Sequence, residues 1–367
     1  MPELNLFEEA NRQLVICNAC RYCEGLCPVF RAIETRRDFE KGDVFYLANL
    51  CHDCRACYYA CMFTPPHEFA INIPQVLSEA RVESYRQWSW PGFLGRAFKR
   101  QGIALLLASA VILLIALLGL ALIGPPRLFS LHTGPGAFYA VVPYLAMVTP
   151  AVALFFYGLA VWFRGTARGW SETDDKPEQM ISGRALAEAI GAALGLRFLQ
   201  GGGPGCTYPE QRPSSSRRVY HSFVFWGFLS DFVSTTLAFI YQDLLHELPP
   251  YPVTSAPVVF GALGGVMLII GTTGLIMLKI QSDRAPANAR AYGMDYTFLI
   301  TLGLTALSGM LLLIFRATPA MGSLLVLHLA LIAALFATAP YGKFVHAIYR
   351  SMALVRYYVE HEDSAKG

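Results

Sequence analysis

Two repeats of one cysteine pattern constrain how the front of this 367-residue chain can fold. Thiolates three residues apart on a tight loop can reach three corners of one iron–sulfur cube. The fourth cysteine of such a run lies a helical turn further on and points away, so it serves a second cube. Both runs have the spacing C-x-x-C-x-x-C-x-x-x-C, and together they hold eight of the nine cysteines: Cys17, Cys20, Cys23 and Cys27, then Cys51, Cys54, Cys57 and Cys61.

The same spacing, with Pro28 after the first run, is the one by which bacterial ferredoxins bind two clusters. Zinc and disulfides are the competing interpretations. Zinc sites usually pair two short C-x-x-C hooks, and disulfides suit small secreted domains, so two identical quartets favour clusters. Met62, where a second proline would follow, is a mild departure. We predict two crossed 4Fe–4S sites: Cys17, Cys20, Cys23 and Cys61 for one cluster, and Cys51, Cys54, Cys57 and Cys27 for the other.

The composition divides the chain into two parts. Hydrophobic residues make up 54% and charged residues only 15%, whereas soluble domains carry about 25% charged residues. Everything before residue 100 resembles a soluble domain, and long apolar runs follow. The net charge of +3 is too small to suggest a nucleic-acid partner. The acidic N-terminus has no apolar core, so we expect no signal peptide.

The apolar runs predict six membrane-spanning helices, each with about twenty apolar residues. We therefore expect a mainly α fold, with a small bacterial-ferredoxin-like two-cluster head followed by a six-helix transmembrane bundle. The predicted spans are 102–123, 138–163, 219–241, 254–279, 295–315 and 323–348. The predicted parts are a head (1–95), helices 1 and 2 (96–163), a loop with an amphipathic helix (164–218), helices 3 to 6 with a haem site (219–350) and a cytoplasmic tail (351–367).

Basic residues predict the orientation. Most basic residues near the spans lie on one side: in the head, in the second and fourth connections and in the tail. The loops on the opposite side hold only Arg127 and Arg316. Positive residues favour the cytoplasmic side. We therefore expect a multi-pass protein of the cytoplasmic (inner) membrane with the head and both termini inside.

The long inner loop has two features of its own. Apolar residues at helical intervals, from Leu186 to Phe198, predict a helix that lies on the membrane surface or against the head. The GGGPGCTYPE segment follows, and its glycines are interpreted as a turn because no G-x-G-x-x-G spacing is met. Cys206 in this segment is interpreted as a packing or solvated cysteine in preference to a redox-active thiol.

Histidines on the predicted spans are candidate haem ligands. His221 opens the third span and His346 ends the sixth, so both lie at the cytoplasmic side and at matching depth. Two neutral imidazoles on facing helices can ligate one haem iron from both sides, which predicts a b-haem beneath the head. The alternative is that these histidines are interfacial and bond to backbone or headgroups.

A second haem would need a partner for His328, which lies near the same face of the sixth span as His346. Asp231 takes the matching place on the third span and is not a haem ligand, whereas His246 in the outer loop is a remote candidate. Asp231 itself has three open interpretations: a proton relay to a quinone, a contact to a haem propionate, or a structural acid.

The chain as a whole resembles the tricarballylate-utilisation protein B family, also called citrate-utilisation protein B. The resemblance rests on CNACRYCEGLCPVF, CHDCRACYYACMFTPPHEFAINIP, GGGPGCTYPE, YHSFVFWGFLSDFVST and PYGKFVHAIYRSMALVRY. It implies a membrane electron-transfer protein with two iron–sulfur clusters and b-haem. It also implies a partner, a soluble FAD-dependent tricarballylate dehydrogenase. Many members have a second histidine where Tyr220 stands here, which weakens the case for a second haem.

We therefore expect an electron conduit from a reduced flavin to membrane quinone. No flavin fingerprint or catalytic triad is present, so substrate oxidation is assigned to the partner. The alternative within electron transfer is a different flavoprotein acceptor, such as a cobalamin-ring monooxygenase. The alternative from another class is a transporter or redox sensor, although no inverted repeat or pair of broken helices is recognised.

Overall fold

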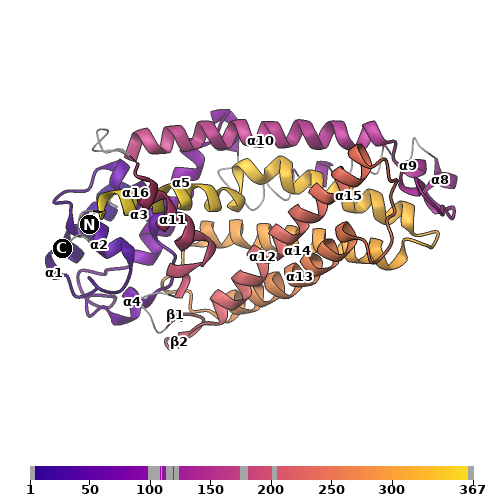
Figure 1. Ribbon diagram of the computed structural model, residues 1–367. Helices are drawn as coiled ribbons and strands as arrows, with labels where there is room; N and C mark the ends of the chain where they lie inside the picture. The colour runs from indigo at the N-terminus through magenta and orange to yellow at the C-terminus, as the bar shows by residue number, and fades with distance from the viewer. Residues whose placement is uncertain are drawn as a thin grey trace.

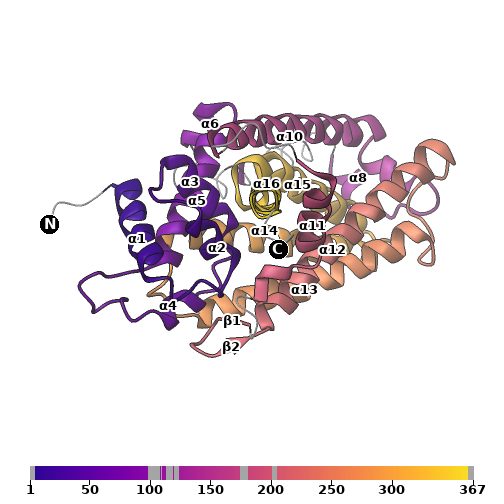
Figure 2. The same ribbon diagram turned by 60° about the vertical axis from the view of Figure 1, so that its left-hand side comes forward.

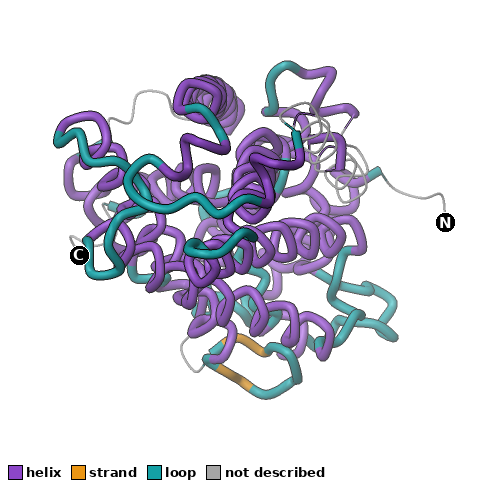
Figure 3. Tube along the Cα trace, turned by 90° about the vertical axis from the view of Figure 1, so that its right-hand side faces the viewer, coloured by secondary structure: helices purple, strands orange, loops and turns teal. Residues whose placement is uncertain are grey.

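A computed structural model describes residues 5–97, 108, 110–112, 119, 124–173, 181–200 and 205–362. Within these residues the fold is almost entirely helical (Figure 1). The one sheet described has two strands, β1 (Cys206–Thr207) and β2 (Pro213–Ser214), which pair antiparallel at the edge of the helices (Figure 3). Most of the predicted span 102–123 lies outside the described residues.

Short helices form the head at one end of the molecule. Asn5 caps the first of them by accepting hydrogen bonds from backbone N–H groups, and Glu8 completes the capping box. Pro74 lies in the first turn of the helix predicted there, where its missing N–H costs nothing. The head helices are α1 (Leu6–Cys20), α2 (Pro28–Glu34), α3 (Lys41–Leu50), α4 (Ala56–Ala60), α5 (Ile73–Trp88) and α6 (Gly92–Ala97).

Within the described residues, five long apolar helices follow the head, each long enough to cross a membrane. They confirm a multi-pass body behind the head. The predicted span 138–163 is divided, because a short helix, α9 (Ala137–Val141), precedes the long one. Another short helix, α8 (Pro125–Phe129), comes before α9. The five spans are α10 (Tyr144–Thr173), α12 (Ser216–Phe239) with its π-helical extension η3 (Ile240–Leu244), α13 (Ala256–Gln281), α14 (Ala289–Phe315) and α15 (Met321–Thr338) with η4 (Ala339–Tyr341).

Helices α12 and α13 pack closely through glycines. A Cβ on Gly264 would meet the Asp231 carboxylate at 2.2 Å and the Gly227 carbonyl oxygen at 2.8 Å. A Cβ on Gly274 would enter the Tyr220 ring, with its nearest atom at 2.2 Å. Small residues let two backbones approach where no hydrophobic effect drives helices together.

The last predicted span, 323–348, is wrong as one continuous helix. Helix α15 ends at Thr338, and two 3₁₀ turns, η4 and η5 (Lys343–Val345), lead into a separate helix, α16 (His346–Glu360). Pro340 lies inside this break, where its missing N–H and its ring prevent a continuous helix. His346 is therefore the first residue of α16 and not the end of α15.

Helix α16 packs into the head. It lies between α3 and α11 (Gly183–Leu194), as Figure 2 shows. Ala353, Leu354 and Tyr357 are buried in the same core as the head helices. Glu360 forms an ion pair with Arg36, Nη2 to Oε1 at 2.7 Å. The C-terminal residues through Glu360 thus belong to the head's core.

The amphipathic helix predicted in the inner loop is α11, followed by the 3₁₀ turn η2 (Arg197–Gln200). The small residues of α11 face the protein: Ala189 is buried in the head's core and Ala193 packs against that core. Phe198 of η2 packs against the same core. The larger apolar residues of α11 form an exposed stripe on the other side: Leu186, Ile190 and Leu194.

Candidate functional site

Left-handed backbone turns shape the two cysteine loops. Arg21 in the first loop has φ 55°, and Asp53 and Arg55 in the second have φ 52° and 64°. These conformations turn the chain sharply enough to bring the third cysteine of each run back toward the first. Backbone N–H groups also point at sulfur: that of Asp53 donates to Sγ of Cys51 at 3.4 Å.

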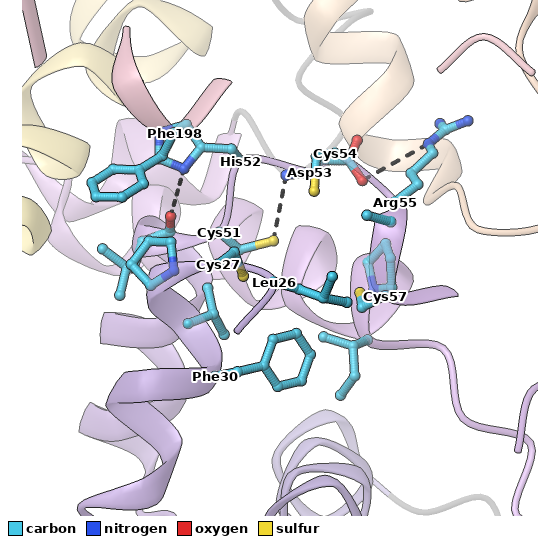
Figure 4. A pocket seen from close by; sticks show the side chains of 16 residues that line it. Leu26, Cys27, Phe30, Cys51, His52, Asp53, Cys54, Arg55, Cys57 and Phe198 are labelled. Atoms are coloured by element: carbon cyan, nitrogen blue, oxygen red, sulfur yellow. Dashed lines mark hydrogen bonds and ion pairs between the residues drawn. The ribbon is translucent and has the colours of Figure 1, made fainter. Parts of the chain in front are cut away.

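The second loop and the end of the first run line one pocket. Figure 4 shows residues that line it, among them the apolar Leu26, Phe30 and Phe198. Its four cysteines are the quartet predicted for one crossed cluster: Cys27, Cys51, Cys54 and Cys57. The fold brings Cys27 to the second loop, as the crossed arrangement requires.

The other four cysteines group in the same crossed way. Burial is the main cause that raises the pKa of the Cys17 thiol to about 12. The nearby thiols of Cys61, Cys23 and Cys20 also disfavour its ionisation. Burial and Cys61 likewise raise the pKa of Cys23 to about 11. Cys61 therefore lies with the first run although it comes from the second.

Burial is also the main cause of the raised pKa at Cys54, about 12, and at Cys27 and Cys57, where the pKa lies well above the usual value. Thiolates in such groups need positive charge to form, and iron supplies it when a cluster binds. Across the described residues, no three His, Cys, Asp or Glu side chains converge on the position of a single metal ion. The quartet of Cys27, Cys51, Cys54 and Cys57 lines one pocket, which suits a cluster.

The two groups differ in their cover. Cys20 is exposed, and Tyr22 and Met62 near it are each 67% exposed. The second group is covered by the segment that contains β1 and β2. The N–H of Thr207 donates to the carbonyl of Cys54 at 3.0 Å, and Nη1 of Arg217 donates to the carbonyl of Asp53 at 2.6 Å.

Aromatic and cationic groups complete this cover. The Tyr208 ring lies between two guanidinium groups, 4.6 Å from that of Arg55 and 5.3 Å from that of Arg217. The Arg55 side chain is fully buried and donates to the carbonyl of Asp283 and to the hydroxyl of Tyr292, both at 2.8 Å. The connection between α13 and α14 is thereby tied to the cluster loop.

Cys206 is fully buried beside Cys54. Its Sγ donates to the carbonyl of Leu199 at 2.6 Å. Burial raises its pKa, although Arg217 opposes the shift. Cys206 is therefore a packing cysteine, one of the two roles that the sequence analysis favoured. Its position beside Cys54 was not predictable from the sequence.

The fold brings together His221 from α12 and His346 from α16. Their ring centroids are 6.2 Å apart and their planes are at 85°. Nδ1 of His346 lies 2.6 Å from the carbonyl of Lys343, whereas Nδ1 of His221 is buried and has no hydrogen-bond partner among the described residues. A metal-ligating histidine usually donates its other ring N–H to a carbonyl in this way.

His328 is placed apart from this pair. Its Nδ1 lies 3.0 Å from the hydroxyl of Ser308 on α14, and the ring fits against Gly309. Among the described residues, its ring contacts no other histidine. Asp231 lies against Gly264 in the α12–α13 contact, as described above.

Charged side chains below the head form a network that the sequence interpretation missed. Asp295 on α14 forms ion pairs with Lys279 at 2.7 Å and with Lys343 at 2.8 Å. An ionisable residue on a predicted span is a signal of such a network. In the sequence, Lys279 and Lys343 were used only to predict the membrane orientation, because nothing in the sequence pairs residues from three separate helices.

Comparison with known proteins agrees with the geometry. The "Citrate utilization protein B Fer4-like domain" profile matches residues 10–87, and the "Citrate utilization protein B" profile matches residues 96–367. The chain belongs to the citrate utilization protein B family. Citrate utilization protein B of Escherichia coli is 38% identical over 358 residues, which cover 96% of this chain and 92% of that protein. No solved structure matches the chain. A Fer4-like domain with eight cysteines indicates iron–sulfur clusters, and the long apolar helices indicate a membrane protein.

Proposed function

We propose that this protein is a membrane electron conduit that reoxidises an FAD-dependent tricarballylate dehydrogenase and passes the electrons to membrane quinone. Its carriers would be two 4Fe–4S clusters and a b-haem, each of which accepts and releases one electron at a time. The head and both termini would face the cytoplasm. There the head would meet the soluble dehydrogenase that the family resemblance implies.

The observation that carries the proposal is that one fold assembles three sites suited to redox groups. The first cysteine group is at an exposed surface, the second group lies under the β1–β2 segment, and the His221–His346 pair follows at the head end of the long helices. Arg350 joins the last two, since it lies one turn after His346 and its Nη2 donates to the carbonyl of Cys51 at 2.7 Å.

The histidine pair fits a haem iron. A metal–imidazole bond is about 2 Å long, so two rings that bind one iron from opposite sides have centroids roughly 6 Å apart. The observed separation of 6.2 Å agrees with that value. Arg217, Arg350 and Lys343 lie close enough to His221 to act on it electrostatically, and such cations suit haem propionates.

The test uses the protein purified without oxygen, together with an FAD-dependent tricarballylate dehydrogenase, tricarballylate and a quinone. We expect iron, acid-labile sulfide and a haem spectrum in the purified protein, and quinone reduction that requires both proteins. With dithionite as the reductant in place of the flavoprotein, the assay measures electron transfer from this protein to quinone alone. Absence of iron and sulfide, or solute transport without electron flow, would refute the proposal.

A further inference from the structure

The carbonyl oxygen of Cys51 accepts hydrogen bonds from two guanidinium groups. Nη2 of Arg81 on α5 donates at 2.6 Å, and Nη2 of Arg350 on α16 donates at 2.7 Å. The same side chains reach the last turn of α3, where Nε of Arg81 donates to the Ala48 carbonyl at 2.7 Å and Nε of Arg350 donates to that of Asn49 at 3.3 Å. The last carbonyls of a helix have no partner within the helix, and they form its negative end.

These two cations have no carboxylate partner in the part of the chain that the structure describes. Two other arginines on the same helices form ion pairs: Arg86 on α5 with Glu83, and Arg356 on α16 with Glu360 at 2.8 Å. Arg81 is buried, Arg350 is half-buried, and they lie close enough to repel each other. Cations in such a place are costly unless an anion compensates them.

We infer that Arg81 and Arg350 are the charge complement of the cluster at Cys27, Cys51, Cys54 and Cys57, and that they give it the higher reduction potential of the two. This inference rests on the proposed function, because it requires both clusters. Four thiolates leave a 4Fe–4S cluster with net negative charge, and reduction adds one more. Two nearby cations therefore stabilise the reduced form more than the oxidised form and raise the potential.

Among the described residues, the first cysteine group has no equivalent pair. Arg12 is bound to Glu9 at 2.6 Å, and Arg21 is exposed and donates to the Asn18 carbonyl at 3.3 Å. Water screens exposed charges strongly. An electron that enters at the exposed group would thus move to the second group with a favourable free energy.

The experiment is a redox titration of both clusters, followed by EPR, in Arg350→Gln and Arg81→Gln. We expect the midpoint potential of one cluster to fall. The equilibrium constant for sharing an electron between the clusters should change about tenfold, which corresponds to about 59 mV for a one-electron couple. The shifted signal should be the one that Cys54→Ser removes. Arg356→Gln and Arg86→Gln are matched controls on the same helices and should leave both potentials unchanged.

Arg350→Lys and Arg81→Lys keep the charge and should retain most of the potential, which separates an electrostatic effect from loss of packing if a glutamine variant fails to assemble. Unchanged cluster potentials in variants with full iron and sulfide content would overturn the inference, as would a shift of the haem potential alone. Absence of iron and sulfide from the unmodified protein would instead refute the proposed function.

Discussion

His221 and His346 face each other with ring centroids 6.2 Å apart, although 125 residues separate them in the sequence (346 − 221). One ring comes from the start of a long apolar helix and the other from the first residue of a head helix. The pair therefore joins the two parts of the molecule, and a haem bound there would lie at their boundary.

His346→Ala should abolish the absorption band of reduced haem, because one axial ligand is lost. His328→Ala is the control: that ring bonds to Ser308 on α14 and is not part of the His221–His346 pair, so the spectrum should persist. Spectra are recorded on purified, dithionite-reduced protein with haem content measured separately. An intact band in His346→Ala would exclude the axial pair.

Cys27→Ser should disturb the cluster bound mainly by the second run, because Cys27 lines the same space as Cys51, Cys54 and Cys57. Low-temperature EPR of the reduced protein measures this. Cys206→Ser should leave both signals, since the Cys206 thiol bonds to the Leu199 carbonyl. If Cys27→Ser removed only the signal that Cys17→Ser removes, the crossed arrangement would be wrong.

Gly271→Ala should destabilise the α12–α13 contact. A Cβ there would lie 2.7 Å from Cγ2 of Val224 and 2.8 Å from the carbonyl oxygen of Tyr220, so the helices would have to move apart. Overpacking of this kind costs about 1–3 kcal/mol. Thermal unfolding in detergent should show a lower midpoint, whereas Gly158→Ala, where a Cβ meets no atom of the described residues within 4 Å, should not lower it.

Glu360 should make the docking of α16 depend on pH. Burial alone raises its pKa, but Arg36 and Arg356 outweigh burial and hold the pKa below the usual 4.5. Because the pKa is lowered in the folded state, this contribution to stability is present above about pH 4.5 and is lost as the pH falls further, through the folded-state pKa.

Glu360→Gln should therefore lower the thermal midpoint at neutral pH by the equivalent of about 1.5–3 kcal/mol, the range for hydrogen bonds to a charged group. The difference from the unmodified protein should shrink toward acidic pH. Glu210→Gln, at an exposed position, serves as the control. A difference that stays constant across pH would show that Glu360 acts without its charge.

Local spacing explains why the grouping of the cysteines was predictable. The three cysteines of each run lie within one loop, so residue order alone brings them close, and the long apolar runs likewise carry their own signal. The crossed partners, Cys27 and Cys61, were also predictable because the ferredoxin pattern repeats. Helix α5 with Pro74 near its start follows from the same kind of local rule.

The break between α15 and α16 could have been predicted from local sequence, but the high hydropathy of the run led to its interpretation as one helix. Pro340 and Gly342 interrupt an otherwise apolar run, and the run was interpreted as one span. Because the break redirects the chain, α16 enters the head's core and Arg350 reaches the Cys51 carbonyl.

Residue order alone determined the sulfur loops, the apolar helices and the two histidines worth pairing, since each depends on neighbours within a few turns. Tertiary structure decided which groups surround them: Cys206 beside Cys54, Asp295 between Lys279 and Lys343, and two unpaired guanidinium groups on one carbonyl. Such contacts join segments that are far apart along the chain. They form only when packing of the whole fold offsets the entropy lost in bringing those segments together.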